Sequence, residues 1–315
     1  MTTSDTPAIQ THNLTKRFGA VEALTGLDMT VQRGEVFGFL GPNGAGKTTT
    51  IRLLLDFIRP TEGRAEMFGL DVRAHAQDLR HRIGNLPGEY SLYPRLSAKD
   101  FLRLCASGHD NGDPPRRIPE LAERLSLDLE RRVGELSTGN KQKVGLIQAM
   151  MHSPDLLMLD EPTSGLDPLM RERFYELIME ERERGATVFF SSHVLPEAER
   201  ICDRVAIVRA GRLAAVEDVE DIKRKKVRRM VLYFSAPVRA SELADDGVRL
   251  LSVEGDNGAA HGVTLEVPAG KVGAVIDRLH GLPVEDMVFP EASLEDTFMA
   301  LYEDGSADGA EGEEK

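Results

Sequence analysis

Short apolar runs alternate with amphipathic stretches through the first two thirds of the chain. The runs EVFGFLG (35–41), DLLMLDE (155–161) and ATVFFSSH (186–193) are apolar almost throughout, which is typical of strands buried on both faces. The stretches 47–58 and 168–185 carry the pattern of helices. Strands that alternate with helices in this way predict an α/β fold with a mainly parallel sheet covered by helices.

A mostly helical segment interrupts this alternation at residues of about 90–150. It contains a polar break, SGHDNGDPPRR (107–117), which is typical of a connection between helices. We interpret the segment as a helical insert within a first domain of residues 1–222.

The pattern changes again in the last third of the chain. Three short runs with strand character and one helical stretch predict a small α+β domain at 228–303: RRMVLYFS (228–235), VRLLSVEG (248–255), GVTLEVP (262–268) and KVGAVIDRLHGL (271–282). A further helix is expected at SLEDTFMALYE (293–303), and the acidic residues 304–315 are expected to form a disordered tail.

Charge and composition narrow the classes of function. The chain of 315 residues has 39 basic and 52 acidic side chains, a net charge of −13, which argues against broad nucleic-acid binding. The basic run KRKKVRR (223–229) fits a solvated helix end or a domain linker better than a nucleic-acid or membrane-surface patch, since its flanks are not basic and no aromatic residues interleave. No apolar run approaches the roughly 18 residues that span a bilayer, so a membrane role is expected to come through a partner.

The sequence GPNGAGKT (41–48) fits a phosphate-binding loop. Such a loop needs glycines so that backbone N–H groups can wrap around phosphate oxygens, and a helix N-terminus that favours anions. Lys47 would contact the β- and γ-phosphates, and the Thr48 hydroxyl could ligate Mg²⁺. The apolar run before the loop and the helix after it supply the expected context. The alternative, a glycine-rich turn without function, is much weaker.

Two carboxylates follow the apolar run LLML. A carboxylate at the carboxyl end of a strand in a parallel sheet lies beside the crevice where nucleotides bind. Asp160 fits the role of a Mg²⁺ ligand, and Glu161 is then placed to polarise an attacking water as a general base. Taken alone, the pair could equally be two solvated acids at a strand end.

Five motifs in this order resemble those of the ATP-binding subunits of ABC transporters. They are the phosphate loop, a signature-like LSTGN (136–140), the acid pair, a D-loop-like SGLD (164–167) and a histidine-loop-like SSH (191–193), within residues of about 9–215. The resemblance implies a P-loop NTPase core that binds and hydrolyses ATP with Mg²⁺ to drive transmembrane transport.

The resemblance also implies roles for individual residues. Lys47, Glu161 and His193 would be catalytic, with His193 sensing the γ-phosphate. Phe18 would stack on adenine, and Asp167 would act in the D-loop. The other nucleotide contacts would come from the phosphate loop and, across a dimer, from the signature loop: Gly41, Asn43, Gly44, Gly46, Thr48, Thr49, Ser137, Gly139 and Asn140.

Two positions depart from the family pattern. The signature loop has Thr138 and Asn140 where Gly and Gln are usual, which is mild because an Asn amide still donates hydrogen bonds. Gly88 stands where a glutamine would ligate Mg²⁺ or water and sense the membrane partner. Glu89, one residue further on, could replace it as a metal ligand, a water could substitute, or the role could stay unfilled.

The resemblance implies partners and a location. We expect a second ATP-binding subunit, in a homodimer, and a multi-span membrane permease that holds the chain at the cytoplasmic face of the cell membrane. FPEASLEDTFMALY (289–302) resembles the ending of ATPases in the drug-exporter branch, similar to the daunorubicin-resistance type. Export of drugs or other hydrophobic small molecules is therefore expected. The alternatives are a soluble ABC-type ATPase of translation or DNA repair, and a nucleotide-gated subunit with little hydrolysis.

Overall fold

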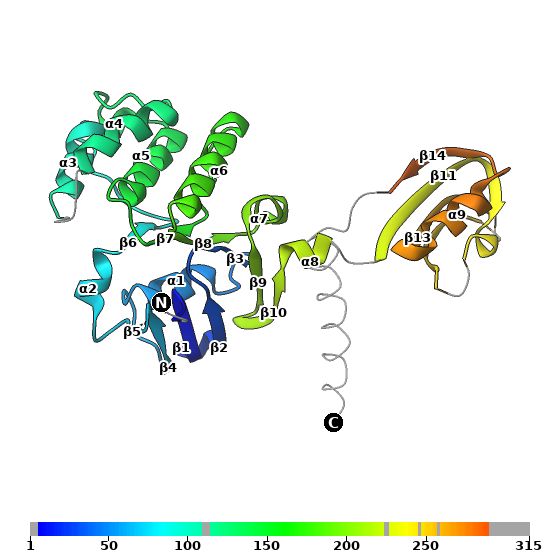
Figure 1. The fold of residues 1–315 in the computed structure, drawn as a ribbon, viewed down its shortest axis with the longest axis horizontal. Helices are drawn as coiled ribbons and strands as arrows, with labels where there is room; N and C mark the ends of the chain where they lie inside the picture. Colours follow the sequence, from blue (N-terminus) through cyan, green and yellow to red (C-terminus); the bar gives the residue numbers. More distant parts are fainter. Residues whose placement is uncertain (1–5, 109–113, 224–226, 245–246, 257–258, 290–315) are drawn as a thin grey trace, which may run out of the picture. The chain divides into compact units, whose positions relative to one another are not determined.

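The structure is a computed structural model, and it describes residues 6–108, 114–223, 227–244, 247–256 and 259–289. The chain divides into two compact units between Asp218 and Val219 (Figure 1). Each unit has a hydrophobic core of its own, one built from residues between Ala8 and Val208 and the other from residues between Met230 and Val275.

A six-stranded sheet forms the centre of the first unit. Its strands, in spatial order, are β10 (Arg212–Asp218), β9 (Arg204–Arg209), β3 (Val36–Leu40), β8 (Thr187–Ser192), β7 (Leu156–Asp160) and β6 (Ile83–Leu86). Only β10 pairs with its neighbour in antiparallel fashion. Every residue of β3, β7 and β8 is buried, which is why these strands carry continuous apolar runs. The α/β class and the parallel sheet are confirmed.

A second, antiparallel sheet in the same unit was not predicted from the sequence. It has the order β2 (Val21–Val31), β1 (Ile9–Phe18), β4 (Glu62–Met67) and β5 (Leu70–Asp71). Its strands mix buried and exposed positions irregularly, and register shifts interrupt the pairing of β1 with both neighbours. These irregularities break the two-residue period that marks a strand in a sequence.

Helix α1 (Lys47–Leu54) contributes to the core between these two sheets. Ile51, Leu53 and Leu54 pack in the same cluster as residues of β1, β2, β3 and β7. The helix ends before the predicted Ile58, and Asp56 beyond its end has left-handed backbone geometry (φ 54°), which does not continue an α-helix. Packing of α1 in the hydrophobic core therefore holds in place the helix that begins at the phosphate loop.

Helices α3 (Ala98–Ala106), α4 (Pro114–Arg124) and α5 (Thr138–Met150) form a group beside α6 (Pro168–Glu183), as Figure 1 shows. Three of the four begin at a side-chain cap, because Ser97, Ser137 and Asp167 each accept a hydrogen bond from a backbone N–H of the first turn. The shorter α2 (Ala76–Arg80) and α7 (Leu195–Ile201) lie elsewhere in the unit. The group occupies the stretch expected to be a helical insert.

The second unit combines an antiparallel sheet with one longer helix. Its strands, in spatial order, are β12 (Arg249–Asp256), β13 (Ala259–Pro268), β11 (Val227–Arg239) and β14 (Val284–Val288). Helix α8 (Val219–Lys223) precedes them and α9 (Val272–Leu279) follows β13. Strand β14 was not predicted, because all five of its residues are exposed and two are acidic. The expected helix 293–303 and tail 304–315 lie outside the described residues, as do residues 224–226 of the basic run.

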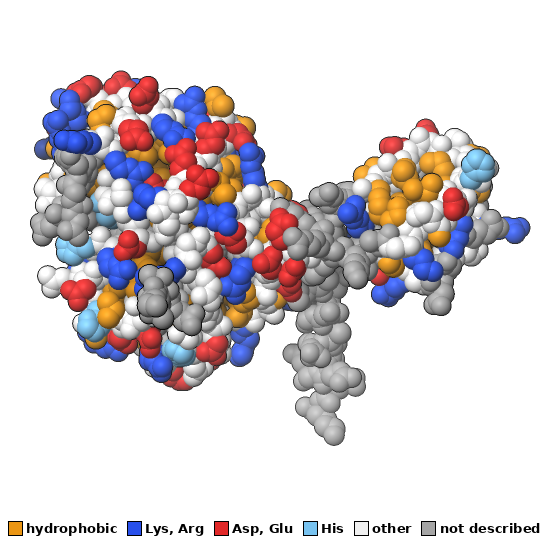
Figure 2. Space-filling view, in the orientation of Figure 1, with side chains coloured by type: hydrophobic (Ala, Val, Ile, Leu, Met, Phe, Trp, Pro, Cys, Tyr) orange, Lys and Arg blue, Asp and Glu red, His pale blue; other side chains and the backbone are white. Residues whose placement is uncertain are grey.

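The two units differ in the surface that they show in Figure 2. Acidic and basic side chains are interspersed over the visible face of the first unit, whereas hydrophobic side chains gather on the second. The partly exposed apolar side chains of the second unit include Leu250, Leu251, Val253, Ile276 and Met287.

Candidate active site

The phosphate loop connects β3 to α1, so its backbone lies at the carboxyl end of a central strand and at the start of a helix. The Lys47 ammonium donates to the carbonyl oxygens of Gly41 (2.8 Å) and Pro42 (3.3 Å), and only 6% of the residue is exposed. The loop therefore curls around its own lysine, which holds the positive charge where a phosphate would bind.

Gly46 can be only a glycine in this backbone. Its φ is 106°, and a β-carbon placed there would lie 2.7 Å from the carbonyl oxygen of Ala23 in β2. Both the left-handed backbone and the close approach exclude a side chain. Strand β2 of the antiparallel sheet thus packs directly against the phosphate loop at Gly46. The sequence motif alone does not reveal this contact.

Asp160 receives two hydroxyl groups from other elements. Thr48, in the first turn of α1, donates to Asp160 Oδ2 at 2.7 Å, and Ser191, in β8, donates to Asp160 Oδ1. Asp160 is 2% exposed and Ser191 is fully buried. Because β7 and β8 are neighbours in which Asp160 and Ser191 pair, the sheet itself brings the hydroxyl to the carboxylate. Sequence reasoning missed Ser191.

Glu161 lies between Lys47 and His193. Its Oε1 is 3.2 Å from Lys47 Nζ, and its Oε2 is 2.8 Å from His193 Nδ1. The Glu161 N–H donates to the carbonyl and hydroxyl oxygens of Ser191, and its φ is 50°, an uncommon value for a residue with a side chain. Such a conformation persists where surrounding contacts enforce it, and it is common at active sites.

Lys47, Thr48 and Glu161 from this group line one cavity of about 210 Å³. Ala23, Pro42, Asn43, Gly44, Gly46, Lys47, Thr48, Thr49 and Glu161 line it. The tertiary structure thus brings the phosphate loop and Glu161 together, although more than a hundred residues separate them in sequence. Phe18 is not among the lining residues; its ring is half exposed at the end of β1, with Lys16 Nζ 4.8 Å from the ring centroid.

The signature-like and D-loop-like segments lie against each other, outside this cavity. Ser137 accepts a hydrogen bond from the Asn140 N–H and Asp167 from the Met170 N–H, so both cap helices. A β-carbon on Gly139 would lie 2.6 Å from the Gly165 carbonyl oxygen, so only a glycine allows this approach. None of these residues lines the phosphate cavity of its own chain.

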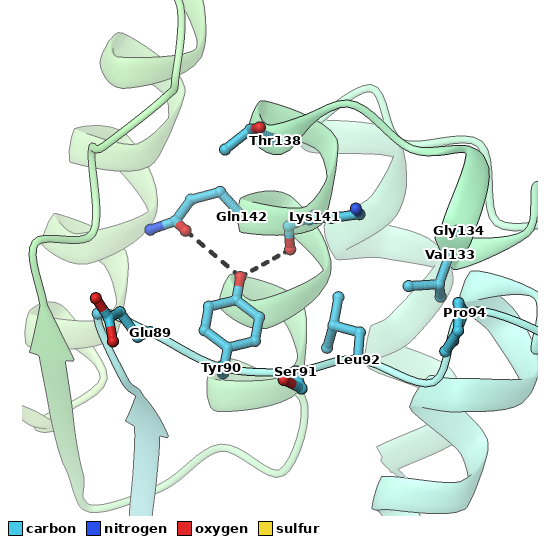
Figure 3. A pocket seen from close by; sticks show the side chains of 11 residues that line it. Glu89, Tyr90, Ser91, Leu92, Pro94, Val133, Gly134, Thr138, Lys141 and Gln142 are labelled. Atoms are coloured by element: carbon cyan, nitrogen blue, oxygen red, sulfur yellow. Dashed lines mark hydrogen bonds between the residues drawn. The ribbon is translucent and has the colours of Figure 1, made fainter.

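Glu89 is exposed and lines a different cavity, of about 450 Å³, together with residues of α5. Its neighbour Gly88 lies beside Asp160: a β-carbon placed on Gly88 would lie 3.1 Å from Asp160 Oδ2. In Figure 3 the Glu89 side chain points away from the ring of Tyr90. Metal binding by Glu89 stays a prediction.

A second residue that sequence reasoning missed is Gln142 of α5. Its amide donates to the carbonyl oxygen of Pro162 (2.9 Å) and, more weakly, to that of Glu161 (3.4 Å). Gln142 is 8% exposed, so these bonds are shielded from water. It therefore ties the helix after the signature-like segment to the peptide that carries Glu161.

The donor set around Asp160 fits Mg²⁺. The Thr48 hydroxyl and the Asp160 carboxylate are hard oxygen ligands already 2.7 Å apart. Among the described residues there is no cluster of three or more His, Cys, Asp or Glu side chains arranged to hold a metal. Mg²⁺ usually binds to one or two protein groups plus substrate phosphates and water, so one hydroxyl and one carboxylate suffice as protein ligands.

Comparison with known proteins decides the family. The family model described as "ABC transporter" matches residues 24–164. The bacitracin transport ATP-binding protein BcrA of Bacillus licheniformis is 33% identical over 317 aligned positions, which cover 95% of this chain and 98% of that protein. The chain belongs to the ABC transporter family. It is an ATP-binding subunit of that family, as its five motifs predicted, and ATP is its nucleotide.

Other members of the ABC transporter family also match this chain. A Nod factor export ATP-binding protein I from Burkholderia orbicola is 33% identical and covers 93% of this chain and 96% of its own. A solved ATP-binding subunit of an ABC transporter superposes with a TM-score of 0.65 at 32% identity, covering 69% of this chain and 92% of that one. The P-loop NTPase core is thereby confirmed. In the described part of this ABC transporter chain, no helix is long and apolar enough to cross a membrane.

Proposed function

We propose that this ATPase powers a separate membrane permease that exports drugs or other hydrophobic small molecules. The observation that carries the proposal is the convergence of Lys47, Thr48 and Glu161 on one cavity, with Asp160 and His193 in contact with them. Two relatives are named as ATP-binding proteins of bacitracin transport and of Nod factor export. Both align with more than nine tenths of this chain, including its second unit. These relatives favour an exporter over a soluble ATPase of translation or DNA repair.

The proposed chemistry is hydrolysis of the terminal phosphate of ATP. The phosphate loop and Lys47 bind the phosphates, and His193 orients Glu161 through the 2.8 Å contact. The Glu161 carboxylate accepts a proton from the water whose oxygen attacks the γ-phosphorus. The bond from that phosphorus to the β–γ bridging oxygen breaks, which gives ADP and inorganic phosphate.

In this proposal Thr48 and Asp160 hold Mg²⁺. The ion would neutralise charge on the β- and γ-phosphate oxygens. Ser191 keeps the Asp160 carboxylate oriented, because its hydroxyl donates to the oxygen that Thr48 does not contact.

Two copies of the chain would share their nucleotides. Ser137, Gly139 and Asn140 lie at the start of α5, where the helix dipole favours an anion, yet they line no part of the phosphate cavity of their own chain. A partner copy could place its own ATP there, in a closed symmetric homodimer. Hydrolysis would then remove the γ-phosphate that joins the two subunits.

The permease would dock in the cavity of about 450 Å³ between the loop after β6 and helix α5. Its lining combines apolar Tyr90, Leu92, Pro94 and Val133 with polar Lys141, which suits the side of a short amphipathic helix. Docking there would hold the chain at the cytoplasmic face of the cell membrane.

Glu161→Gln tests the proposal, since it keeps the shape of the side chain but removes the base. We expect ATP hydrolysis to fall about a hundredfold or more, and a dimer to accumulate with ATP in size-exclusion chromatography. Glu172→Gln, the same change at a half-exposed residue of α6 that pairs with Arg200, is the matched control. Unchanged hydrolysis in Glu161→Gln would contradict the role of general base.

A second measurement addresses the partner. The chain is purified gently from its own membranes, and the proteins that accompany it are identified by mass spectrometry. A multi-span membrane protein is expected. Recovery with ribosomes or DNA instead would overturn the transport proposal while leaving the ATPase chemistry intact.

A further inference from the structure

Tyr90 joins the loop after β6 to helix α5. Its hydroxyl donates to the carbonyl oxygen of Lys141 at 2.9 Å and lies 3.4 Å from Gln142 Oε1, as Figure 3 shows. Burial raises the pKa of Tyr90 to about 12, so the hydroxyl keeps its proton at every pH at which the enzyme would be assayed. It is therefore a permanent hydrogen-bond donor to the helix.

Gly145 makes room for this contact. A β-carbon on Gly145 would lie 2.5 Å from the Tyr90 hydroxyl oxygen and 2.6 Å from Leu86 Cδ1. Glycine is a poor residue for the middle of a helix, where it costs about 1 kcal/mol relative to alanine. Its presence in α5 is explained by the ring that packs against it.

From Gln142 the contacts continue to the backbone of the peptide that carries the catalytic Glu161. The Gln142 amide donates to the carbonyl oxygens of Pro162 and Glu161, and it does so from a buried position. Glu161 has a left-handed backbone, so the orientation of its carboxylate depends on contacts that hold this peptide in place. Tyr90 and Glu161 are thus linked through one intervening side chain.

The other side of Tyr90 faces the proposed docking cavity. Tyr90 lines that cavity of about 450 Å³ and also a neighbouring one of about 460 Å³ that includes Phe101 and Gly145. An occupant of either cavity would touch the ring directly. Gly88, in the same loop, has no side chain with which to pass on such a contact.

We propose that Tyr90 is a positioning residue that orients the general base Glu161 through Gln142, and that it connects the docking cavity to hydrolysis. The inference rests on the proposed function, because it needs Glu161 to act as the base. Its distinctive consequence is that the Tyr90 hydroxyl affects the rate of the chemical step more than the binding of ATP.

The test compares Tyr90→Phe with Tyr93→Phe in the full-length purified chain. Both changes remove one hydroxyl from the same loop, but Tyr93 is 62% exposed and lies outside the docking cavity. Loss of the Tyr90 hydrogen bond should lower kcat about fivefold and change KM for ATP less than about twofold. Tyr93→Phe should keep the wild-type kcat within about 1.5-fold.

A double-mutant cycle with Gln142→Met separates positioning from general loss of structure. If Tyr90 acts through Gln142, adding Tyr90→Phe to Gln142→Met should lower kcat by less than about 1.5-fold. A fully additive fivefold loss would overturn the proposed route. Thermal unfolding of each variant shows whether the folded state is retained.

Two kinds of failure can be told apart in the same assay. If the wild type does not hydrolyse ATP, or if Glu161→Gln hydrolyses it normally, the proposed function is wrong. If both behave as expected but Tyr90→Phe has the same kcat as Tyr93→Phe, only the role of Tyr90 is wrong.

Discussion

At the scale of single residues, the buried hydroxyl of Ser191 holds two residues of the candidate active site in place. It donates to Asp160, and its carbonyl and hydroxyl oxygens accept the N–H of Glu161. One side chain therefore contacts the proposed metal ligand and the backbone of the proposed base. The sequence SSH did not distinguish it from Ser192, since both serines end the same strand.

We expect Ser191→Ala to lower kcat about tenfold, because a buried hydrogen bond to a carboxylate is lost. The matched control is Ser192→Ala, the same change at the next residue, whose hydroxyl contacts Val194 and Glu197 instead. Steady-state hydrolysis at saturating ATP measures both variants. Equal kcat values in the two variants would show that the Asp160 contact is not needed.

The residues of the phosphate loop and the acid pair could be predicted because each belongs to a contiguous motif with a chemical requirement. The hydrogen bonds of Tyr90, Gln142 and Ser191 could not, since each joins groups that are far apart in sequence. Gly145 left a faint signal, a glycine within a predicted helix, whose reason becomes clear only when the ring of Tyr90 is placed beside it.

At the scale of elements, an ion-pair group fastens α4 to α6. Glu181 is 2% exposed, and it accepts hydrogen bonds from Arg117 of α4 and from Arg184 just after α6. The adjacent Glu180 pairs with Arg124, but about half of the Glu180 side chain is exposed. Burial, more than the number of pairs, decides how much each contributes.

Glu181→Gln should therefore lower the free energy of unfolding by about 1–3 kcal/mol, because two arginines lose a buried partner. Glu180→Gln should change it by no more than about 0.5 kcal/mol, since water screens the exposed pair. Denaturant unfolding of both variants measures the difference. Similar losses of unfolding free energy in the two variants would mean that the burial of Glu181 does not increase the stability that its ion pairs contribute.

The strands of the central sheet that are buried at every residue were predicted, whereas β6 and β9, which are mostly buried, were not. Strands β3, β7 and β8 are buried throughout and were predicted within one or two residues. The antiparallel sheet of the first unit and strand β14 were missed, because their residues mix polar and apolar types without a clean period.

At the scale of the whole molecule, the two units carry separate cores. All residues that line the phosphate cavity belong to the first unit. A shortened chain that ends after α8 keeps Val219 and Ile222, which are buried, and removes the sheet of the second unit.

A chain of residues 1–223 should fold and bind ATP with a dissociation constant within about threefold of the full-length value, a difference of less than 1 kcal/mol. Calorimetric titration with ATP and a thermal unfolding scan test this, with Lys47→Ala as the variant expected to lose tight binding in both lengths. Failure of residues 1–223 to fold would show that the second unit contributes to the stability of the first.

The sequence by itself determined the phosphate loop and the acid pair, because close backbone approach and strand-end carboxylates require particular residues at fixed spacing. The family was indicated by the resemblance of its five motifs. Only the tertiary structure decided how these groups meet. The pairing of β7 with β8 placed Ser191 on Asp160, and the packing of the Tyr90 ring against Gly145 connected the docking cavity to Gln142. Such contacts depend on which helices and strands pack side by side. The pattern of apolar and polar residues indicates that an element is buried, but not which other element it contacts.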